Sequence, residues 1–470
     1  MRLITHYFTL VIVVMLFAAT RSSAQIQLPP GLGPTASTAG LPGLPAAPQR
    51  NRIPRRLTLD AAEEILLQNN LTIVAARYGV DIARAQRLVA SMRPNPTLTL
   101  GAEQFDVGHP TQFIVSTNSN AAANRVYTSR YDQVFERGNK RELRTAAADF
   151  QLQSAEAQVL DATRTQMLQL KQAFLNALLA RDNLRVADEN LALINSTEQL
   201  IKLHVSTGDV AEWDLIKFQS NRVQYQRDLV TARLSYQQST RDLLNLMGAE
   251  PSDVSNIVTT ASDQTAQELA DAPLEVIGDL SVKPVSLQLD QLQQTALANR
   301  PDVIAAMRAE QAAQKSLDLA YALRHRDVDV AVEYQREGGE NTVGFIVSIP
   351  LFINNNHQGE INQALAQLSV VKTQLSQAKL QAMTDVDKAY KSYQLSKQML
   401  DVYTAETLLK SEESYKIAGV SYKEGASSLL ELQDAQRTYN QTRVQYNQAH
   451  FDYRMSLYQI EAATGKQLIK

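Results

Sequence analysis

Hydrophobic and polar residues alternate in two pairs of short segments. Apolar residues take every second position from Val328 to Tyr334, within 327–336, and every second position from Val343 to Leu351, within 342–352. A weaker alternation occupies 97–106 and 126–135. A period of two places apolar side chains on one face of a strand and polar side chains on the other. The pattern therefore predicts four amphipathic strands arranged as two hairpins.

Long stretches without Gly or Pro follow each predicted hairpin. They predict four long helices over 139–205, 210–247, 360–420 and 427–464. At 1.5 Å per residue the longest would extend about 100 Å. From Ile361 onward apolar residues recur every three or four positions, close to the coiled-coil period, with Ala, Ser and Gln on the flanks. Small flanks favour helices that are packed on two sides.

The chain contains two copies of one design. Leu57 to Ala85 aligns with Leu287 to Lys315 at an offset of 230, and the segment from Ser206 aligns with that from Lys423 at an offset of 217. The extra residues of the first copy fall mostly in a polar stretch from His109, which we expect to form a longer exposed loop. Each copy reads as helix, strand, loop, strand, very long helix, tight turn and helix.

These patterns divide the chain into six regions. They are a signal peptide (1–24), a Pro-rich linker (25–56), a first repeat (57–248), an acidic linker between the repeats (249–286), a second repeat (287–465) and a C-terminal tail (466–470). The signal peptide is inferred from Arg2, an apolar run that ends near Ala19 and small residues before position 25. A retained membrane anchor is the alternative, although the run is shorter than the ~20 residues that span a bilayer.

Composition excludes several classes of function. The 470 residues carry a net charge of -3, which favours neither nucleic-acid binding nor bulk disorder. There is no cysteine, so disulfides, thiolate metal sites and an acylated N-terminal cysteine are excluded. The histidines lack metal-ligand spacing, and no phosphate-binding loop or nucleophile motif occurs. We therefore expect no catalytic residue, no metal site and no cofactor, and a protein that is not an enzyme.

An exported chain with amphipathic strands suits a membrane. Outside the N-terminus no apolar stretch is long enough for a transmembrane helix, so any membrane crossing would use strands. Apolar residues would then face lipid and polar residues a water-filled lumen. Four strands do not close a barrel, whereas three chains would supply twelve. An exported coiled-coil stalk, such as an adhesin, is the alternative from a different class, but it would not need two matched hairpins.

Four segments carry a resemblance to the TolC-type outer-membrane efflux proteins. They are "IPLFINNNHQGEI" at 349–361, "QVFERGNKREL" at 133–143, and the turns "STGDVAEWD" and "KEGASSLLELQDA". The resemblance covers Leu57 to Gly465. It implies a mainly α protein with a transmembrane β-barrel, in which a homotrimer forms a 12-stranded outer-membrane barrel continued by a periplasmic α-helical tunnel. The implied partners are outer-membrane lipid, a periplasmic adaptor and an inner-membrane pump of the resistance-nodulation-division (RND) or ABC type.

The resemblance also assigns roles at the two tight turns. Gly208 and Gly425 match the tip positions that contact the adaptor, and Trp213 beside the first tip is either an adaptor contact or a packing anchor. Tyr422 matches a gate tyrosine and Asp214 its acidic partner. Glu431 and Asp434 match an inward acidic ring at the periplasmic aperture, although a solvated helix face is the alternative for both. Ser427 stands where the family has a gate arginine, so the resemblance leaves open two alternatives, an absent lock and a lock built differently.

The cargo is left open by the sequence. The 349–361 junction resembles the heavy-metal branch of the family, whose members pair with RND pumps. The chain lacks any Cys or Met/His cluster that would bind metal. Export of small toxic organic compounds, and type I protein secretion, therefore stay as alternatives to metal efflux.

Overall fold

A computed structural model describes most of the chain. The described residues are 53–103, 126–208, 210–250, 253–254, 274–337 and 340–467. All of them belong to one unit, Arg50–Lys470. The expected signal peptide, most of the Pro-rich linker and the loop expected from His109 lie outside the described residues.

The first repeat begins with two helices rather than the single helix expected. α2 (Leu59–Asn69) and α3 (Leu71–Ser91) are separated at Asn70, whose backbone is extended. The Asn70 side chain accepts hydrogen bonds from the backbone N–H groups at the start of α3, at 3.0 and 3.1 Å. An Asn that caps a new helix therefore ends the old one, and the apolar periodicity runs through the break unchanged. The repeat ends with the long hairpin of α5 (Lys140–Thr207) and α6 (Glu212–Leu246).

The second repeat differs from expectation at two helices. α8 (Leu289–Asn299) and α9 (Pro301–Ala322) again replace one helix, here because Pro301 holds Arg300 in an extended conformation. The single helix expected over 360–420 is wrong: α10 (Gln358–Val402) ends at Tyr403 and α11 (Ala405–Lys423) begins after it.

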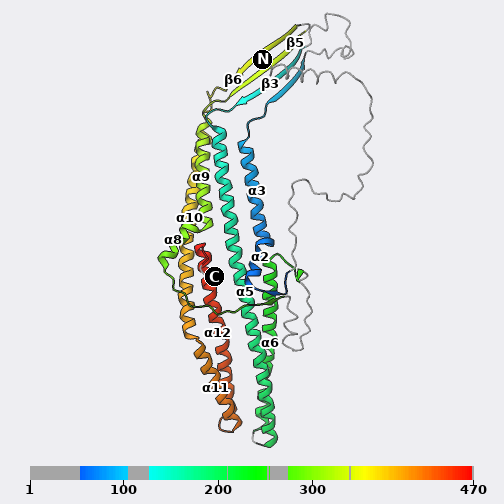
Figure 1. The fold of residues 1–470 in the computed structure, drawn as a ribbon, viewed down its shortest axis with the longest axis vertical. Coiled ribbons are helices and arrows are strands. Elements are labelled where there is room, and N and C mark those ends of the chain that lie inside the picture. The colour runs from blue at the N-terminus through cyan, green and yellow to red at the C-terminus, as the bar shows by residue number, and fades with distance from the viewer. Residues whose placement is uncertain are drawn as a thin grey trace, which may run out of the picture. The chain divides into compact units, whose positions relative to one another are not determined.

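A capping threonine explains that break. Thr404 accepts a hydrogen bond from the Thr407 backbone N–H at 3.2 Å, so it starts α11 where neither Gly nor Pro is present. Absence of helix breakers therefore did not guarantee a continuous helix. α12 (Leu429–Thr464) returns beside α10 and α11 to complete the second hairpin (Figure 1).

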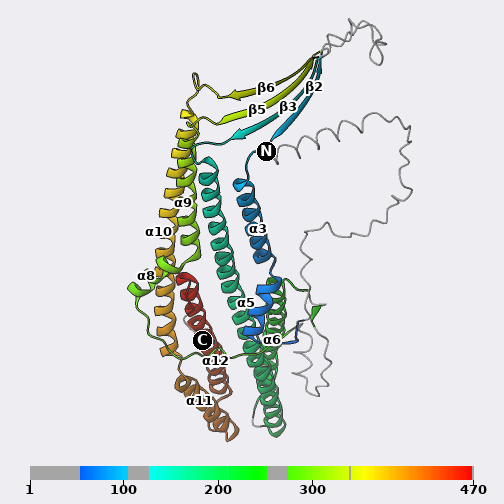
Figure 2. The same ribbon diagram turned by 45° about the horizontal axis from the view of Figure 1, so that its top comes forward.

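The four predicted strands form one antiparallel sheet. β2 (Thr97–Glu103), β3 (Val126–Phe135), β5 (Val328–Glu337) and β6 (Glu340–Ser348) pair in that order. Figure 2 shows them side by side beyond the ends of α9 and α10. The strand expected over 342–352 is wrong at its end, because β6 stops at Ser348 before Pro350, which has no backbone N–H to donate.

The sheet has one apolar and one polar face. Across the four strands Leu98 lies opposite Tyr131, Tyr131 opposite Val332, and Val332 opposite Phe345. Side chains on alternate positions share a face, so the apolar set consists of Leu98, Leu100, Tyr127, Tyr131, Phe135, Val332, Tyr334, Val343, Phe345 and Val347, all exposed. The polar set includes Thr97, Thr99, Thr128, Arg130, Asp132, Asp329, Glu333 and Gln335. The predicted amphipathic character of the strands is confirmed.

Segments on both sides of the first repeat complete the helical core. β1 (Arg56–Leu57) pairs in parallel with β4 (Glu275–Val276), which lies in the acidic linker. Leu57 and Val276 are buried in a cluster with Phe174 of α5. The end of the expected extended linker and the described C-terminal part of the acidic linker are therefore packed against the helices.

The two repeats match in tertiary detail. Gly248 and Gly465 both have positive φ. A Cβ at Gly248 would lie 2.6 Å from the Asn69 carbonyl oxygen at the end of α2. A Cβ at Gly465 would lie 3.1 Å from the Asn299 carbonyl oxygen at the end of α8. Those four positions obey the offsets of 217 and 230 seen in the sequence. The internal duplication thus extends from the sequence to the contacts between helices.

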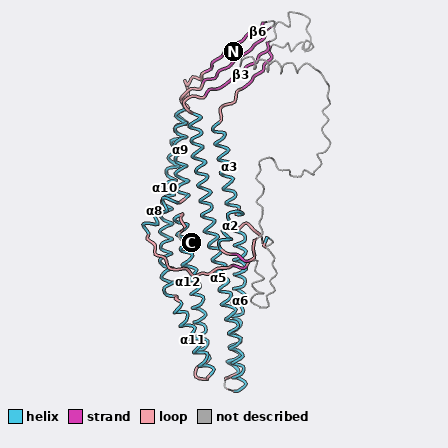
Figure 3. The backbone as a smooth tube through the Cα atoms, in the orientation of Figure 1, coloured by secondary structure: helices cyan, strands magenta, loops and turns pink. Residues whose placement is uncertain are grey.

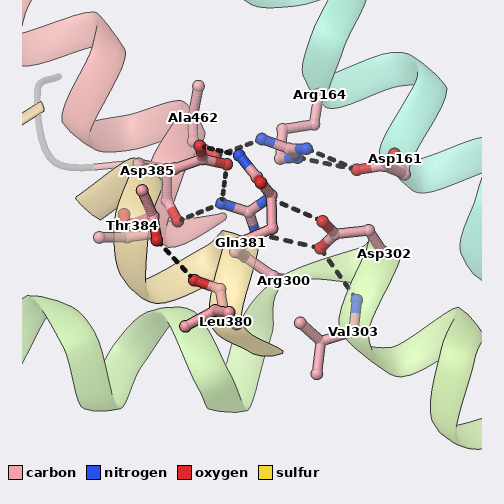
Figure 4. Close-up of polar contacts among 12 residues, drawn as sticks. Asp161, Arg164, Arg300, Asp302, Val303, Leu380, Gln381, Thr384, Asp385 and Ala462 are labelled. Carbon is pink, nitrogen blue, oxygen red and sulfur yellow. Dashed lines mark hydrogen bonds and ion pairs between the residues drawn. The ribbon is translucent and has the colours of Figure 1, made fainter. Parts of the chain in front are cut away.

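Arg300 replaces Asn70 at the equivalent break of the second repeat. Asn70 donates to the Leu246 carbonyl at 2.8 Å, and Arg300 donates to the Ala463 carbonyl at 3.4 Å. Arg300 is only 2% exposed. It also pairs with Asp302 at 2.6 Å and with Asp385 of α10 at 3.0 Å (Figure 4).

Electrostatics in this cluster favour the charged forms. Burial alone would raise the pKa of Asp302, but the hydrogen bonds and charge of Arg300 outweigh burial and hold that pKa below its ordinary value. Nearby, Arg164 of α5 pairs with Asp161 at 2.7 Å and donates to the Ala462 carbonyl at 2.6 Å (Figure 4). The cluster therefore joins α5, α9, α10 and the end of α12. Within the described residues, none of the helices is long and apolar enough to cross a membrane.

Candidate functional site

The two helical tips lie together at the end of the hairpins farthest from the sheet (Figure 3). The first tip joins α5 to α6, and the second joins α11 to α12. Gly208 and Gly425 occupy these turns with φ of +84° and +76°. No atom lies within 4 Å of the position that a Cβ would take at either glycine. Their left-handed backbone, rather than crowding, is what favours glycine at both turns.

An apolar cluster holds the two tips against each other. We call it the tip cluster; its buried members are Ile194, Ile201, Phe218, Tyr422 and Leu432. The first three come from α5 and α6, and the last two come from α11 and α12. Burial of these side chains between the hairpins makes the two tips one packed unit in a single chain.

Tyr422 is the predicted aperture residue that lies deepest. It is 6% exposed, and its ring packs edge-on against His204 with centroids 5.9 Å apart. Burial raises the pKa of Tyr422, and the carboxylate of Asp214 raises it further. The structure therefore brings Tyr422 close to Asp214, the two residues that the resemblance paired. Within the described residues the Tyr422 hydroxyl is buried and has no hydrogen-bond partner.

Glu431 has a local role that the sequence reasoning missed. Its carboxylate accepts a hydrogen bond from the Ser428 backbone N–H at 2.9 Å, and its own N–H donates to the Ser428 hydroxyl at 3.3 Å. This reciprocal pair is a capping box at the start of α12. The signal was present in the sequence, because Ser-x-x-Glu before a helix is the pattern of a capping box. Glu431 remains exposed, so the cap does not remove its charge from solvent.

Asp434 lies on the exposed side of the next turn and lines a groove. The groove runs between α5, α6 and α12 and has a volume of about 740 Å³. Its lining is rich in side-chain amides, including Asn183, Asn190, Asn221, Gln224, Gln433, Asn440, Gln441 and Gln445. Both polar atoms of the Asn440 amide are buried and lack a partner within the described residues. The amides therefore offer hydrogen-bonding groups along a groove whose lining also includes apolar side chains, such as Ile194, Phe218 and Val444.

The remaining predicted tip residues lie apart from the tip cluster. Trp213 is 66% exposed, with the Lys217 ammonium 5.2 Å from its ring centroid. Ser427 donates to the Ala418 carbonyl at 3.5 Å, a contact within its own hairpin. The only tryptophan of the chain is therefore available at the surface of the first tip.

Glu198 was not predicted, yet it organises the first hairpin above the tip. It is 4% exposed and accepts hydrogen bonds from Gln219 at 2.9 Å and Arg222 at 2.8 Å, with Lys202 also at 2.8 Å. Hydrogen bonding from Lys202 is the largest cause that lowers the pKa of Glu198. The Glu-x-x-x-Lys spacing was visible in the sequence, but only packing shows that the Glu198 carboxylate is buried, while Lys202 stays exposed. Between the hairpins, Arg443 of α12 pairs with Glu189 of α5.

Chemistry at the tips is confined to charge and polarity. Across the described part of the chain, no three His, Asp or Glu side chains are placed together so that they could hold a metal ion. The arrangement presents exposed carboxylates and two open glycine turns at one end of the helices.

Comparison with known proteins gives a consistent family. Residues 64–249 and 292–466 match the profile of the family described as outer membrane efflux protein. The chain is 24% identical over 422 residues to the cobalt-zinc-cadmium resistance protein CzcC of Cupriavidus metallidurans, covering 89% of this chain and 92% of that protein. It is 22% identical over 437 residues to the pyoverdine export outer membrane protein OpmQ of Pseudomonas putida, covering 87% and 84%.

A solved structure shares the fold. The open state of the Neisseria gonorrhoeae MtrE outer membrane channel superposes with a TM-score of 0.68 at 16% identity, covering 87% of this chain and 89% of that one. At this identity the likeness concerns the fold alone.

Proposed function

Because this chain belongs to the outer membrane efflux protein family, we propose that three copies of it form the exit duct of a tripartite efflux assembly. The chain is an outer-membrane efflux channel, with its helices in the periplasm. The trimer, the closed barrel and the individual partners are our proposal. The observation that carries it is a sheet with one apolar and one polar face, joined to long helical hairpins that end in tight turns.

The sheet supports closure by three chains. β2 and β6 form its edges and have no further strand partner within the described residues. An exposed edge with unpaired N–H and C=O groups is costly in a bilayer unless it pairs with another strand. Pairing of β6 with β2 of the next copy would close a barrel of twelve strands, with apolar side chains toward lipid and polar ones toward the lumen.

Two exposed helical stripes support the same assembly. On α6 apolar side chains recur at coiled-coil spacing, and the members of this stripe are Trp213, Ile216, Val223, Val230 and Leu234. A second stripe follows α10 and α11 and consists of Leu395, Met399, Val402, Leu409, Ile417 and Val420. Exposed apolar seams at this spacing suit helices of neighbouring copies.

The tips supply the aperture and the adaptor contacts in this proposal. Three copies of Glu431 and Asp434 would place carboxylates around a narrow opening, and Asp214 would act with Tyr422 inside the packed tip. Gly208, Gly425 and Trp213 would contact the periplasmic adaptor. Both turns are open, and Trp213 is exposed, so their side chains and backbone are available to such a partner. An RND-type pump in the inner membrane is the proposed source of energy.

Single-channel recording of the purified protein in a planar bilayer tests this function. The informative variant is Glu431→Gln/Asp434→Asn, because glutamine preserves the capping box while it removes the charge. We expect small cation-selective steps from the wild type and loss of that selectivity in the variant. A matched control, Glu64→Gln/Asp290→Asn, neutralises two exposed carboxylates on α2 and α8 and should leave selectivity unchanged.

The outcomes separate the parts of the proposal. Conducting channels with unchanged selectivity in the tip variant would discard the acidic aperture and retain the duct. A protein that gives no channels and stays soluble without detergent would reject the duct and favour an exported stalk.

Heavy-metal ions are the proposed cargo. The similarity to a protein named for cobalt, zinc and cadmium resistance supports it, as does an aperture lined with carboxylates. A small organic compound is the second candidate, since a relative is named for pyoverdine export. The two cargoes are distinguished by measuring metal accumulation in cells that lack their own outer-membrane channel. The cells are compared with and without this chain and its pump. Metal efflux requires that accumulation falls when the chain is present.

A further inference from the structure

Four arginines lie where the sheet meets the helices. The register places Thr97 opposite Asp132, Phe135 opposite Val328, and Asp329 opposite Ser348. The four segments that connect strands to helices, at 92–96, 136–139, 323–327 and 349–357, therefore leave the sheet at the same end. These connections carry the exposed side chains that we call the arginine belt: Arg93, Arg137, Arg324 and Arg326.

Contacts between the connections hold the belt together. The Arg137 backbone N–H donates to Asp327 at 2.9 Å, which joins two of the connections. The Arg324 guanidinium donates to Gln358 at 2.9 Å, and that of Arg326 lies 5.8 Å from the Phe352 ring centroid. The hydrogen bond from Arg141 is the largest cause that lowers the pKa of Glu142 at the start of α5, and the positive charge of Arg93 lowers it further. The four side chains therefore lie on connected segments at one end of the sheet rather than on separate loops.

The carboxylates around the belt are engaged by other side chains, three of them cationic and one a histidine. The pairs are Lys140 with Asp327 at 2.8 Å, Arg144 with Glu136 at 2.8 Å, Arg141 with Glu142 at 2.7 Å, and His357 with Glu360 at 3.2 Å. Within the described residues, none of the four belt guanidiniums forms an ion pair. The belt is therefore a surface of uncompensated positive charge.

The opposite end of the sheet has the reverse charge. Among the described residues at that end, Glu103, Glu337, Glu340 and Arg336 are exposed. Within the described part of the chain, arginine therefore outnumbers the exposed carboxylates only at the end where the helices begin. Between the two ends lies the apolar face, and it continues to the belt through Phe135, Leu351 and the 81% exposed Ile353.

This arrangement points to a lipid ligand. We infer that the arginine belt binds the anionic phosphodiester headgroups of phospholipids at the periplasmic side of the outer membrane. The inference rests on the proposed insertion of the sheet into that membrane. Apolar side chains would enter the acyl region, and guanidiniums just beyond them would lie at headgroup depth. A guanidinium matches a phosphate with two parallel N–H···O bonds, and its charge favours anionic over zwitterionic lipid by about fivefold per arginine engaged.

Lipid association in vesicles tests the inference. The full-length protein is reconstituted in phosphatidylcholine with a trace of spin-labelled phosphatidylglycerol or spin-labelled phosphatidylcholine, and electron spin resonance measures the fraction of label held at the protein. We expect the anionic label to associate at least threefold more strongly than the zwitterionic one, with the difference falling as salt rises. The variant Arg93→Gln/Arg137→Gln/Arg324→Gln/Arg326→Gln should abolish the difference.

Two further variants test whether the lipid preference depends on total charge or on the arginines of the belt. Arg185→Gln/Arg227→Gln/Arg241→Gln/Arg308→Gln removes the same charge from the helices and should keep the preference. The belt variant with lysine at all four positions keeps the charge but loses the paired N–H···O geometry, so it should keep only part of the preference. Unchanged conductance of the glutamine variant in the same vesicles shows that its loss of preference is not a folding defect.

Clear results would overturn the inference. Equal association of both labels with the wild type, or equal loss in the helix control and the belt variant, would reject it. Displacement of the anionic label by inorganic phosphate at constant ionic strength would assign the belt to free phosphate instead of lipid. Conductance measured on the same vesicles separates the two proposals, because channels without lipid preference reject only the belt, whereas absence of channels rejects the proposed function.

Discussion

Replacement of Arg300 should destabilise the helical part more than any exposed charge change. Arg300→Met keeps the length of the side chain but leaves Asp302 and Asp385 without their partner. Removal of one member of a buried ion pair costs about 3–5 kcal/mol. The two aspartates are 26% and 33% exposed, so solvent screens part of this loss. We therefore expect a smaller loss of about 2–3 kcal/mol.

Thermal unfolding followed by circular dichroism at the helical signal measures this effect. For a chain of 470 residues a loss of 2–3 kcal/mol corresponds to a fall in Tm of about 2–3 °C. Arg308→Met is the matched control, since Arg308 lies on the same helix and donates only to Gln311, at 2.9 Å. A combined Arg300→Met/Asp302→Asn/Asp385→Asn variant should recover part of the loss, because amides leave no buried charge unpaired.

The pH dependence checks the same cluster independently. The pKa of Asp302 is lowered in the folded chain, so its contribution to stability is complete above the ordinary aspartate pKa and is lost as the pH falls below about 4. The acid-induced fall in Tm should therefore be smaller in Asp302→Asn than in the wild type. If Arg300→Met and Arg308→Met melt at the same temperature, the buried cluster has no stabilising role and this reasoning is wrong.

Substitutions at four further positions test the turns and caps. Gly248→Ala should lower the free energy of unfolding by about 3 kcal/mol, because positive φ is combined with a steric clash. Gly208→Ala should lower it by about 1 kcal/mol, from the positive φ alone. Comparison of the two Tm values tests this difference. Glu431→Ala should lose about 1 kcal/mol of helix stability and Glu431→Gln much less, and equal losses would reject the capping box with Ser428. Thr404→Ala should destabilise the start of α11 by about 1 kcal/mol, seen as faster amide hydrogen exchange confined to that helix; unchanged exchange would contradict the role of the cap.

Periodicity in the sequence was sufficient for the main elements. A period of two located β3 at the residues expected, because an amphipathic strand must alternate whatever surrounds it. The repeat offsets located the matching positions of Gly248 and Gly465, whose equivalent contacts the structure then shows. Family membership followed from the junction and tip segments for the same reason, since local sequence specifies a turn or a strand end directly.

Helix breaks and side-chain partners required the tertiary structure. Tyr403 and Thr404 interrupt α10 and α11 without Gly or Pro, because a side chain that caps a new helix competes with the helix it ends. The sequence marked Glu431 as a charge at the tip, but only the coordinates show its carboxylate on the Ser428 N–H. Whether a polar side chain hydrogen-bonds to water, to the backbone or to a neighbouring side chain depends on distances that a linear sequence does not contain.

The tip and the arginine belt show the same division. The family resemblance paired Tyr422 with Asp214 as a prediction, and the structure added that Tyr422 is buried between the hairpins and that the Asp214 charge raises its pKa. The arginines of the belt are far apart in the sequence, and strand register alone brings their connections to one end of the sheet. Sequence determined the elements because their periodicity is local, whereas the tertiary structure decided the sites because a site is made by contacts between distant segments.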